Sequence, residues 1–164
     1  MAIRVGVLTV SDKASRGERV DTAGPAVADL MAIFGAVVAE RAIVADEPEQ
    51  IAAQLARWAD EMKLDIVLTT GGTGLSLRDV TPEATLAVAD REVPGIGEVM
   101  RQVGLKSTHL APLSRAVAVT RGRTLIVNLP GSERGARESL QAILDMLPHA
   151  VELLKGEAGD SHPV

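Results

Sequence analysis

The sequence predicts an α/β fold, in which helices cover both faces of a mostly parallel sheet that has an antiparallel edge. Three observations support this prediction. Short, nearly continuous apolar runs, such as residues 3–10 and 65–70, are typical of parallel strands buried on both faces. Helical patterns alternate with these runs, which favours right-handed crossovers between neighbouring strands. Near the end of the chain, residues 121–123 are the only link between two apolar runs, which favours an antiparallel hairpin.

The first half of the chain contains three expected strands and two expected helices. The strands cover residues 3–10, 36–44 and 65–70, and the helices cover residues 25–35 and 48–63, with a polar loop at 11–22. Pro25 suits the first turn of a helix, because an amide hydrogen there has no helical partner. The second helix has one apolar face, formed at three- and four-residue spacing by Ile51, Leu55, Trp58 and Met62.

The second half contains three expected helices and two expected strands. The helices cover residues 81–91 and 96–103 and a segment that follows Ser132, and the strands cover residues 116–120 and 124–129. Thr81 and Pro82 resemble a capped helix start, and Pro94 is expected to end that helix. Ser132 is expected to cap the last helix, which breaks near Pro148. Its inward face is formed by Ile143, Leu144, Leu147, Val151 and Leu154.

Length and composition restrict the possible classes of protein. The 164 residues fit one domain, which we assign to residues 1–156, followed by a polar tail at 157–164. The absence of cysteine excludes disulfides, thiolate metal sites and cysteine nucleophiles. A net charge of −5, with only Phe34 and Trp58 aromatic, argues against nucleic-acid binding. Residues 66–77, the longest uncharged stretch, are too few to cross a membrane, and no signal-peptide pattern is present, so we expect a cytoplasmic protein.

Polar and glycine residues follow the expected strands. In open α/β sheets, ligands bind outside the carboxyl ends of the strands. Four loops are expected to meet at that edge, namely residues 11–13, 46–47, 71–79 and 130–132. Their convergence predicts a pocket more strongly than any one loop does.

The loop of Gly71, Gly72, Thr73 and Gly74 offers backbone amides to a ligand. With so few side chains, these amides can approach an anion closely, and Thr73 adds a hydroxyl group, so the loop suits a phosphate. The loop is neither a P-loop nor a dinucleotide fingerprint, because the required residues and spacing are absent. A tight turn that needs glycine conformations is an equally good interpretation of the loop by itself.

Asp46 and Asp79 place two carboxylates at the same predicted edge. Mg²⁺ is usually bound by one or two carboxylates together with substrate phosphates, so this pair is a candidate magnesium site. Both residues also have a structural interpretation. Asp46 and Glu49 have the spacing of a capping box, and Asp79 precedes the helix start at Thr81.

Two further groups are candidates for a chemical role. Ser114 and Arg115, just before the late strand pair, offer a hydroxyl group and a guanidinium to a polar ligand, although a surface loop explains them too. The histidines have no serine and carboxylate arrangement that would predict a catalytic triad; they are His109, His149 and His162.

The motifs in these loops, taken in order, resemble those of the molybdopterin adenylyltransferase (MogA/MoaB-like) family. The matching segments are residues 10–15, 46–47, 68–74, 78–85, 89–98, 113–115 and 128–131. The resemblance spans about residues 3–156, and it is specific because several long motifs occur in the right order.

The resemblance implies a three-layer α/β/α domain that assembles as a homotrimer and acts in molybdenum cofactor biosynthesis. The implied reaction transfers AMP from Mg-ATP to the phosphate of molybdopterin and releases pyrophosphate. The implied partners are molybdopterin, ATP and a molybdenum insertase that receives the product. Asp46 and Asp79 match the catalytic, metal-binding positions. The positions that match substrate-binding residues are Ser11, Asp12, Gly71, Gly72, Thr73, Gly74, Ser114, Pro130 and Gly131.

Two other functions are compatible with the same residues. A non-catalytic carrier would bind molybdopterin without releasing pyrophosphate, although paired metal ligands weigh against it. A nucleotide pyrophosphatase would use water as the acceptor instead of molybdopterin. The chain departs from longer family members in one place, since Ser132 leads almost directly into the last helix. This shorter segment affects the expected edge of the pocket and a subunit contact rather than the transfer chemistry.

Overall fold

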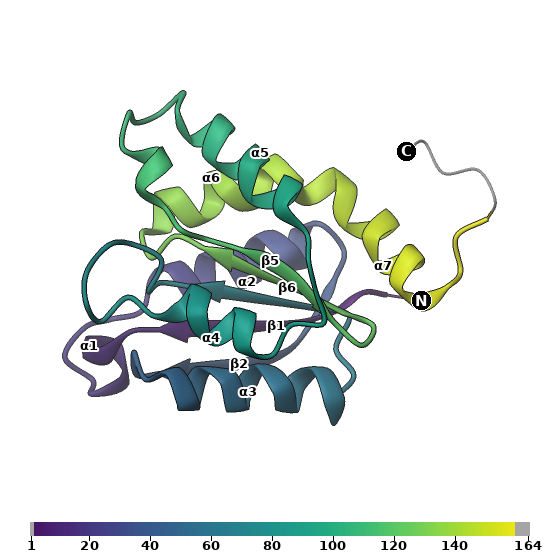
Figure 1. Ribbon diagram of the computed structural model, residues 1–164, viewed down its shortest axis with the longest axis horizontal. Helices are drawn as coiled ribbons and strands as arrows, with labels where there is room; N and C mark the ends of the chain where they lie inside the picture. Colours follow the sequence, from purple (N-terminus) through teal and green to yellow (C-terminus); the bar gives the residue numbers. More distant parts are fainter. Residues whose placement is uncertain (1, 160–164) are drawn as a thin grey trace.

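The computed structural model describes residues 2–159, in which a six-stranded sheet lies between two layers of helices (Figure 1). The strand order is β2-β1-β3-β6-β5-β4. The strands are β1 (Arg4–Val10), β2 (Val37–Val44), β3 (Ile66–Thr70), β4 (Arg91–Glu92), β5 (Ala118–Arg121) and β6 (Thr124–Leu129). The first three strands and β6 run parallel, whereas β5 is antiparallel to both β6 and β4. This confirms the predicted mostly parallel sheet with an antiparallel edge.

Two hydrophobic clusters, one on each face of the sheet, hold the helical layers in place. The helices are α1 (Asp12–Ser15), α2 (Ala23–Ile33), α3 (Pro48–Asp60), α4 (Thr81–Ala87), α5 (Pro94–Gly104), α6 (Glu133–Ile143) and α7 (Leu147–Lys155), with 3-10 turns η1 (Ala111–Leu113) and η2 (Leu144–Met146). One cluster packs α2, α5, α6 and α7 against the sheet, around residues such as Met31, Met100 and Leu140. The other packs α3 and α4 around Trp58. The fold is therefore the three-layer arrangement that the sequence predicted.

The path of the chain leaves a topological switch point between β1 and β3. From β1 the chain passes through α2 to β2 on one side, and it returns through α3 to β3 on the other side of β1. Figure 1 shows the loops that follow β1 and β3 at the left of the sheet, away from the two termini at the right. Because ligands of open α/β sheets bind at such a point, this edge is where a site is expected.

Asn128 of β6 connects the sheet to α4 beneath that edge. Its side chain is fully buried, and its amide nitrogen donates to Thr69 Oγ1 (3.1 Å) and Thr85 Oγ1 (3.0 Å). Its side-chain oxygen accepts a hydrogen bond from the backbone amide of Val117 (3.2 Å). This network fixes β3, α4 and the start of β5 around one residue of β6.

The predicted polar loop at 11–22 contains a short helix. Ser11 Oγ accepts a hydrogen bond from the amide of Ala14 (3.1 Å) and so caps α1. Four residues show no apolar periodicity, and therefore the pattern of the sequence did not reveal this helix.

The segment around residues 81–104 differs from the prediction. Helix α4 ends at Ala87 rather than Arg91, since Arg91 and Glu92 pair with Thr120 and Val119 of β5. The edge strand is thus β4, and the predicted hairpin of β5 and β6 lies one strand inward. Pro94 starts α5 instead of ending the preceding helix, because a proline fits the first turn of a helix. Thr81 does not cap α4, and no side chain does.

The last helical region follows the prediction in part. Ser132 Oγ accepts a hydrogen bond from the amide of Gly135 (3.0 Å), which confirms the predicted cap of α6. The break lies at η2, before Pro148, and this proline occupies the first turn of α7. Leu144 and Leu154 are only partly buried. Within residues 2–159 no helix has the length and apolar character needed to cross a membrane. Residues 160–164 of the predicted tail lie outside the described residues.

Candidate functional site

A cavity of about 440 Å³ opens at the carboxyl ends of β1 and β3, at the switch point of the sheet. Its wall is built from segments that are distant in the sequence. They are residues 9–11 and 14 at the end of β1, residues 19–23 before and at the start of α2, Asp46, residues 70–72, Asp79, and residues 131–132. The predicted convergence of loops at this edge is therefore confirmed.

Asp12 and Asp46 are tied together by two backbone-to-carboxylate hydrogen bonds. The amide of Asp12 donates to Asp46 Oδ2 (2.8 Å), and the amide of Asp46 donates to Asp12 Oδ1 (2.9 Å). The pair joins α1 to the loop after β2. The expected capping box does not form, since Glu47 is the N-cap of α3 and its side chain makes no cap hydrogen bond. The side chain of Asp46 is committed to the site instead of to the helix.

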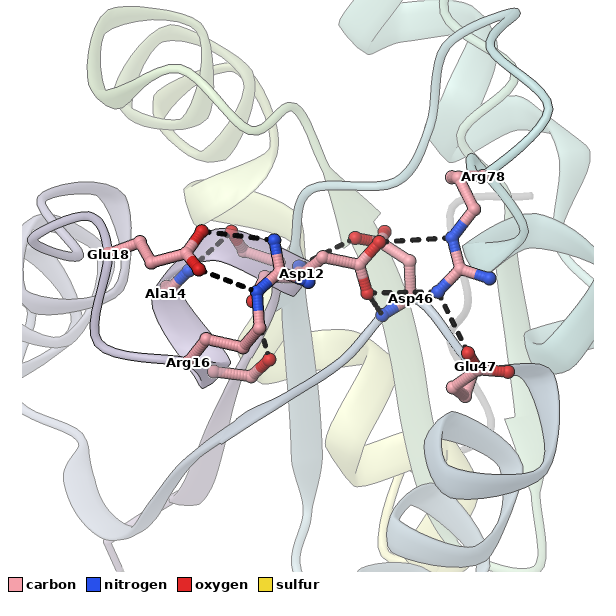
Figure 2. A network of polar contacts seen from close by, with 9 residues as sticks. Asp12, Ala14, Arg16, Glu18, Asp46, Glu47 and Arg78 are labelled. Carbon is pink, nitrogen blue, oxygen red and sulfur yellow. Dashed lines mark hydrogen bonds and ion pairs between the residues drawn. The ribbon is translucent and has the colours of Figure 1, made fainter.

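Arg78 links three of the loops at the cavity edge, as Figure 2 shows. Its guanidinium donates to both carboxylate oxygens of Asp12 (3.0 Å each) and to Glu47 Oε1 (2.8 Å). These bonds lower the pKa of the Asp12 carboxyl, and the hydrogen bond from Asp46 acts in the same direction. Asp12 is thus held ionised, and its own oxygens are already occupied by partners on the protein.

The loop between β3 and α4 presents Asp79. Its Oδ2 accepts a hydrogen bond from the amide of Ser76 (3.1 Å), which closes a short turn. Arg115 fastens this loop from the other side, because its guanidinium donates to the carbonyl oxygens of Gly74 and Asp79 (2.8 Å each) and pairs with Glu83. The guanidinium that the sequence offered to a polar ligand therefore supports the loop.

Asp46 stands out electrostatically among these carboxylates. Burial raises the pKa of the Asp46 carboxyl above its ordinary value, and the negative charges of Asp12 and Asp79 act in the same direction, against the hydrogen bond from the Asp12 amide. A divalent cation near Asp46 and Asp79 would offset this repulsion. No group of three or more histidine or acidic side chains suited to a metal occurs within residues 2–159. Two carboxylates of one cavity wall fit Mg²⁺ when substrate oxygens complete its ligands.

The glycine loop is divided by the structure. Gly71 and Gly72 line the cavity, whereas Thr73 and Gly74 pack toward Arg115, whose amide donates to Thr73 O (2.8 Å). Gly71 has φ +98°, and an added Cβ would lie 2.3 Å from Val10 O, so only glycine fits there. Its amide already donates to Leu129 O (3.1 Å), so within this loop Gly72 is the remaining cavity-lining residue whose amide is a candidate donor. Of the four residues of the glycine loop, only Gly71 and Gly72 line this cavity, whereas the carbonyl oxygens of Thr73 and Gly74 accept hydrogen bonds from Arg115.

A second cavity, of about 300 Å³, adjoins the first at Ser132, which lines both. Ser114 and Pro130 line this second cavity, whereas Ser11 and Gly131 line the first. The wall of the second cavity also includes Gly97, Met100, Arg101, Gly104, Thr108, Leu110, Ala111, Ala116, Gly135, Glu138 and Ser139. The sequence motifs predicted one pocket around all the candidate positions. The structure places most of them on two adjoining spaces, whereas Asp12, Thr73 and Gly74 line neither.

Several residues at the site were not found from the sequence. Arg78 occurs in a matching motif, but nothing in the spacing showed that it binds Asp12 and Glu47. Arg19 and Thr70 line the larger cavity, and no local pattern marked either of them. Neither His109 nor His149 lines either of these two cavities, and His162 lies outside the described residues.

Comparisons with known proteins agree on one family. Residues 6–149 match the family model described as "Probable molybdopterin binding domain". A molybdopterin adenylyltransferase of Helicobacter pylori J99 is 42% identical, over 94% of this chain and 89% of that protein. A molybdopterin adenylyltransferase of Escherichia coli K12 is 40% identical, over 98% of this chain and 90% of that protein. Among solved structures, the molybdopterin biosynthesis enzyme MoaB of Thermus thermophilus has a TM-score of 0.89 and 57% identity, covering 94% of this chain and 97% of that one.

Proposed function

Because the chain belongs to the molybdopterin-binding domain family of molybdenum cofactor biosynthesis, we propose that it is a molybdopterin adenylyltransferase. In the proposed reaction, AMP passes from Mg-ATP to the phosphate of molybdopterin, and pyrophosphate is released. The relatives named for this activity cover nearly the whole chain at about 40% identity. That similarity supports the reaction class, and the geometry of the site supports its details.

One observation carries the proposal, namely two adjoining cavities that meet at Ser132, one of them lined by Asp46 and Asp79. A transfer between two substrates needs two binding spaces that share a boundary, so that the reacting groups meet. The carboxylates of one space suit the metal that accompanies a triphosphate. A single enclosed pocket would not separate donor from acceptor in this way.

In the proposed transfer, one bond to the α-phosphorus of ATP forms and one breaks. A phosphate oxygen of molybdopterin attacks the α-phosphorus of ATP, and the bond from that phosphorus to the bridging oxygen breaks as pyrophosphate leaves. No protein nucleophile is required, and the chain contains no cysteine to act as one. A terminal phosphate is already largely ionised near neutral pH, so no strong general base is required either.

The residues of this chain act mainly by positioning and by charge. Asp46 and Asp79 would hold Mg²⁺, which when bound neutralises phosphate charge. Gly72 lines the cavity, and its amide is proposed to donate to a phosphate oxygen. The Asp12 amide orients Asp46 by its hydrogen bond to Asp46 Oδ2, and Arg78 holds the Asp12 carboxylate. Ser11, Gly131 and Ser114 line the two spaces and are proposed to contact the substrates.

We test the proposal with Asp46→Asn and Asp79→Asn. Purified protein, Mg²⁺, ATP and molybdopterin are mixed, and adenylyl-molybdopterin is detected by mass spectrometry while pyrophosphate is followed in parallel. Each variant is expected to lose at least about 100-fold in rate, because charge neutralisation provides much of the catalysis in phosphoryl transfer. Glu49→Gln is the matched control, since Glu49 is an exposed carboxylate in the first turn of α3, outside both cavities.

Each outcome has a defined meaning. Product that requires both substrates and the metal supports the transferase, and unchanged activity in both aspartate variants contradicts the metal role. Bound but unaltered molybdopterin would indicate a carrier, and ATP cleavage without molybdopterin would indicate a pyrophosphatase.

The assembly and the fate of the product are further parts of the proposal. We propose that the chain forms a homotrimer and passes its product to a molybdenum insertase. Support for self-association comes from Leu105, Leu110 and Leu113, each about half exposed within one short stretch of the chain. Exposed apolar side chains gathered in this way favour a protein contact over exposure to water.

A further inference from the structure

Thr70, the last residue of β3, has a buried hydroxyl group without a hydrogen-bond partner. The residue is 1% exposed, and its Oγ1 has no hydrogen-bond partner among residues 2–159. Thr70 also lines the 440 Å³ cavity. Buried hydroxyl groups in folded proteins almost always have a partner, because an unsatisfied one destabilises the fold. A hydroxyl left unpaired at a cavity wall therefore indicates that the partner belongs to a ligand.

The neighbours of Thr70 show that its hydroxyl has no structural task. Thr9 is its partner in the register of β1 and β3, and Thr9 Oγ1 donates to Asp21 Oδ2 (2.6 Å). Thr69 precedes it on the same strand, and Thr69 Oγ1 accepts a hydrogen bond from Asn128 (3.1 Å). Three threonines of similar burial thus differ in one respect, and Thr70 alone among them retains an unused hydroxyl.

The charge at the cavity indicates which ligand group Thr70 meets. Arg19 is the single basic residue among the described residues that line this cavity. Unlike Arg16, which pairs with Glu18 (3.0 Å), Arg19 takes part in no ion pair within residues 2–159. A guanidinium without an ion pair and a hydroxyl group without a partner, on two residues that line one cavity, suit the oxygens of a phosphate.

We propose that Thr70 Oγ1 donates a hydrogen bond to a phosphate oxygen of a substrate, and that Arg19 contributes positive charge to the same substrate. This inference rests on the proposed function, because ATP and molybdopterin both carry phosphate groups. Thr70 is then a substrate-binding residue of the same cavity that Asp46 and Asp79 line.

The decisive variant is Thr70→Val, which removes the hydroxyl group and keeps the shape of the side chain. Binding of Mg-ATP and of molybdopterin is measured separately by calorimetric titration, which does not depend on turnover. We expect affinity for one of the two to fall about tenfold or more, as for a lost hydrogen bond to a charged group. The affected substrate identifies the source of the phosphate. Thr70→Ser is expected to retain most of the affinity.

A stability measurement separates this role from a structural one. The melting temperature of Thr70→Val should equal or exceed that of the wild type, because the variant buries no unsatisfied hydroxyl. Thr69→Val is the matched control on the opposite face of the strand. It should lower the melting temperature and leave both affinities within about twofold of wild type, since its hydroxyl serves Asn128. To test the role of charge, Arg19→Gln should weaken binding of the same substrate that Thr70→Val affects. Arg16→Gln should leave that binding unchanged.

Wild-type affinity of Thr70→Val for both substrates would overturn the inference. A lower melting temperature together with unchanged affinity would show that the hydroxyl has a structural partner instead. If the wild type binds substrate and loses affinity on Thr70→Val but forms no product, the proposed function fails and this inference stands. If the wild type makes product and Thr70→Val binds both substrates normally, only this inference fails. A wild type that binds neither substrate would contradict both.

Discussion

At the scale of single residues, we expect the ionised carboxylate of Asp46 to lower the stability of the fold while it supports activity. Its carboxyl has a raised pKa in the folded state, so the native protein holds this proton more tightly than the unfolded chain does. Stability from this group is therefore present below the unfolded pKa, near the ordinary value of 3.8, and is lost as the pH rises through the folded pKa. At neutral pH the ionised side chain is a source of repulsion.

We therefore predict that Asp46→Asn unfolds at a higher temperature than wild type at pH 7. An asparagine oxygen can still accept the hydrogen bond from the Asp12 amide, whereas the repulsion from Asp12 and Asp79 is gone. The difference should shrink as the pH falls through the raised folded pKa, because the wild-type carboxyl then takes up a proton. Thermal melts of both proteins at a series of pH values from about 3.5 to 7 measure this difference. A variant that melts below wild type at pH 7 would show that Asp46 stabilises the fold as an anion.

Alanine substitutions at Gly71 and Gly35 distinguish the stability cost of a positive φ from the cost of a steric clash. Both have nearly the same φ, +98° and +99°, but an added Cβ would lie 2.3 Å from Val10 O at Gly71 and would meet nothing within 4 Å at Gly35. Gly35→Ala is expected to lower the free energy of unfolding by about 1 kcal/mol, because alanine is strained at this φ. Gly71→Ala should cost at least about 2 kcal/mol more, because a backbone carbonyl must also move. Urea unfolding compares the two, and equal losses would contradict the packing argument.

At the scale of elements, the start of α6 supports both cavities. Ser132 caps this helix through its bond from Gly135 and also lines the two spaces. We predict that Ser132→Ala lowers the free energy of unfolding by about 1 kcal/mol, which corresponds to a melting temperature about 2–4 °C lower. Ser132→Asn, which can still cap the helix, should recover most of that loss. Thermal unfolding of both variants is the measurement. An alanine variant as stable as wild type would mean that the cap is dispensable.

At the scale of the whole molecule, the exposed leucines near the end of α5 predict self-association. Sedimentation should give a particle of about three times the 17.2 kDa chain mass if the proposed homotrimer forms. Leu113→Glu places a charge on a half-exposed apolar position, and we expect it to shift the particle toward smaller species if these leucines form the contact. A wild-type monomer at micromolar concentration would contradict the proposed assembly.

The elements that the sequence determined are those whose signals are local. Helix α3 follows from the spacing of Ile51, Leu55 and Trp58, and the cap of α6 follows from Ser132. The strands β1 and β3 follow from their continuous apolar runs. Each of these patterns depends on neighbours in the chain, and burial in the folded protein agrees with them. The glycine loop and the two aspartates were found for the same reason, since loops after parallel strands must meet at one edge.

Only the tertiary structure decided which partners these residues have. Strand β4 forms because β5 offers an unpaired edge to Arg91 and Glu92, and Pro94 then begins a helix instead of ending one. Arg115 supports the loop of Asp79 across 36 positions of sequence, and this use of its guanidinium depends on packing. The division into two cavities, and the unpaired hydroxyl of Thr70, likewise arise from segments that approach one another only in the folded chain. Local propensity is encoded in adjacent residues, whereas hydrogen-bond satisfaction and cavity shape depend on contacts distant in the sequence, and so they were settled by the fold itself.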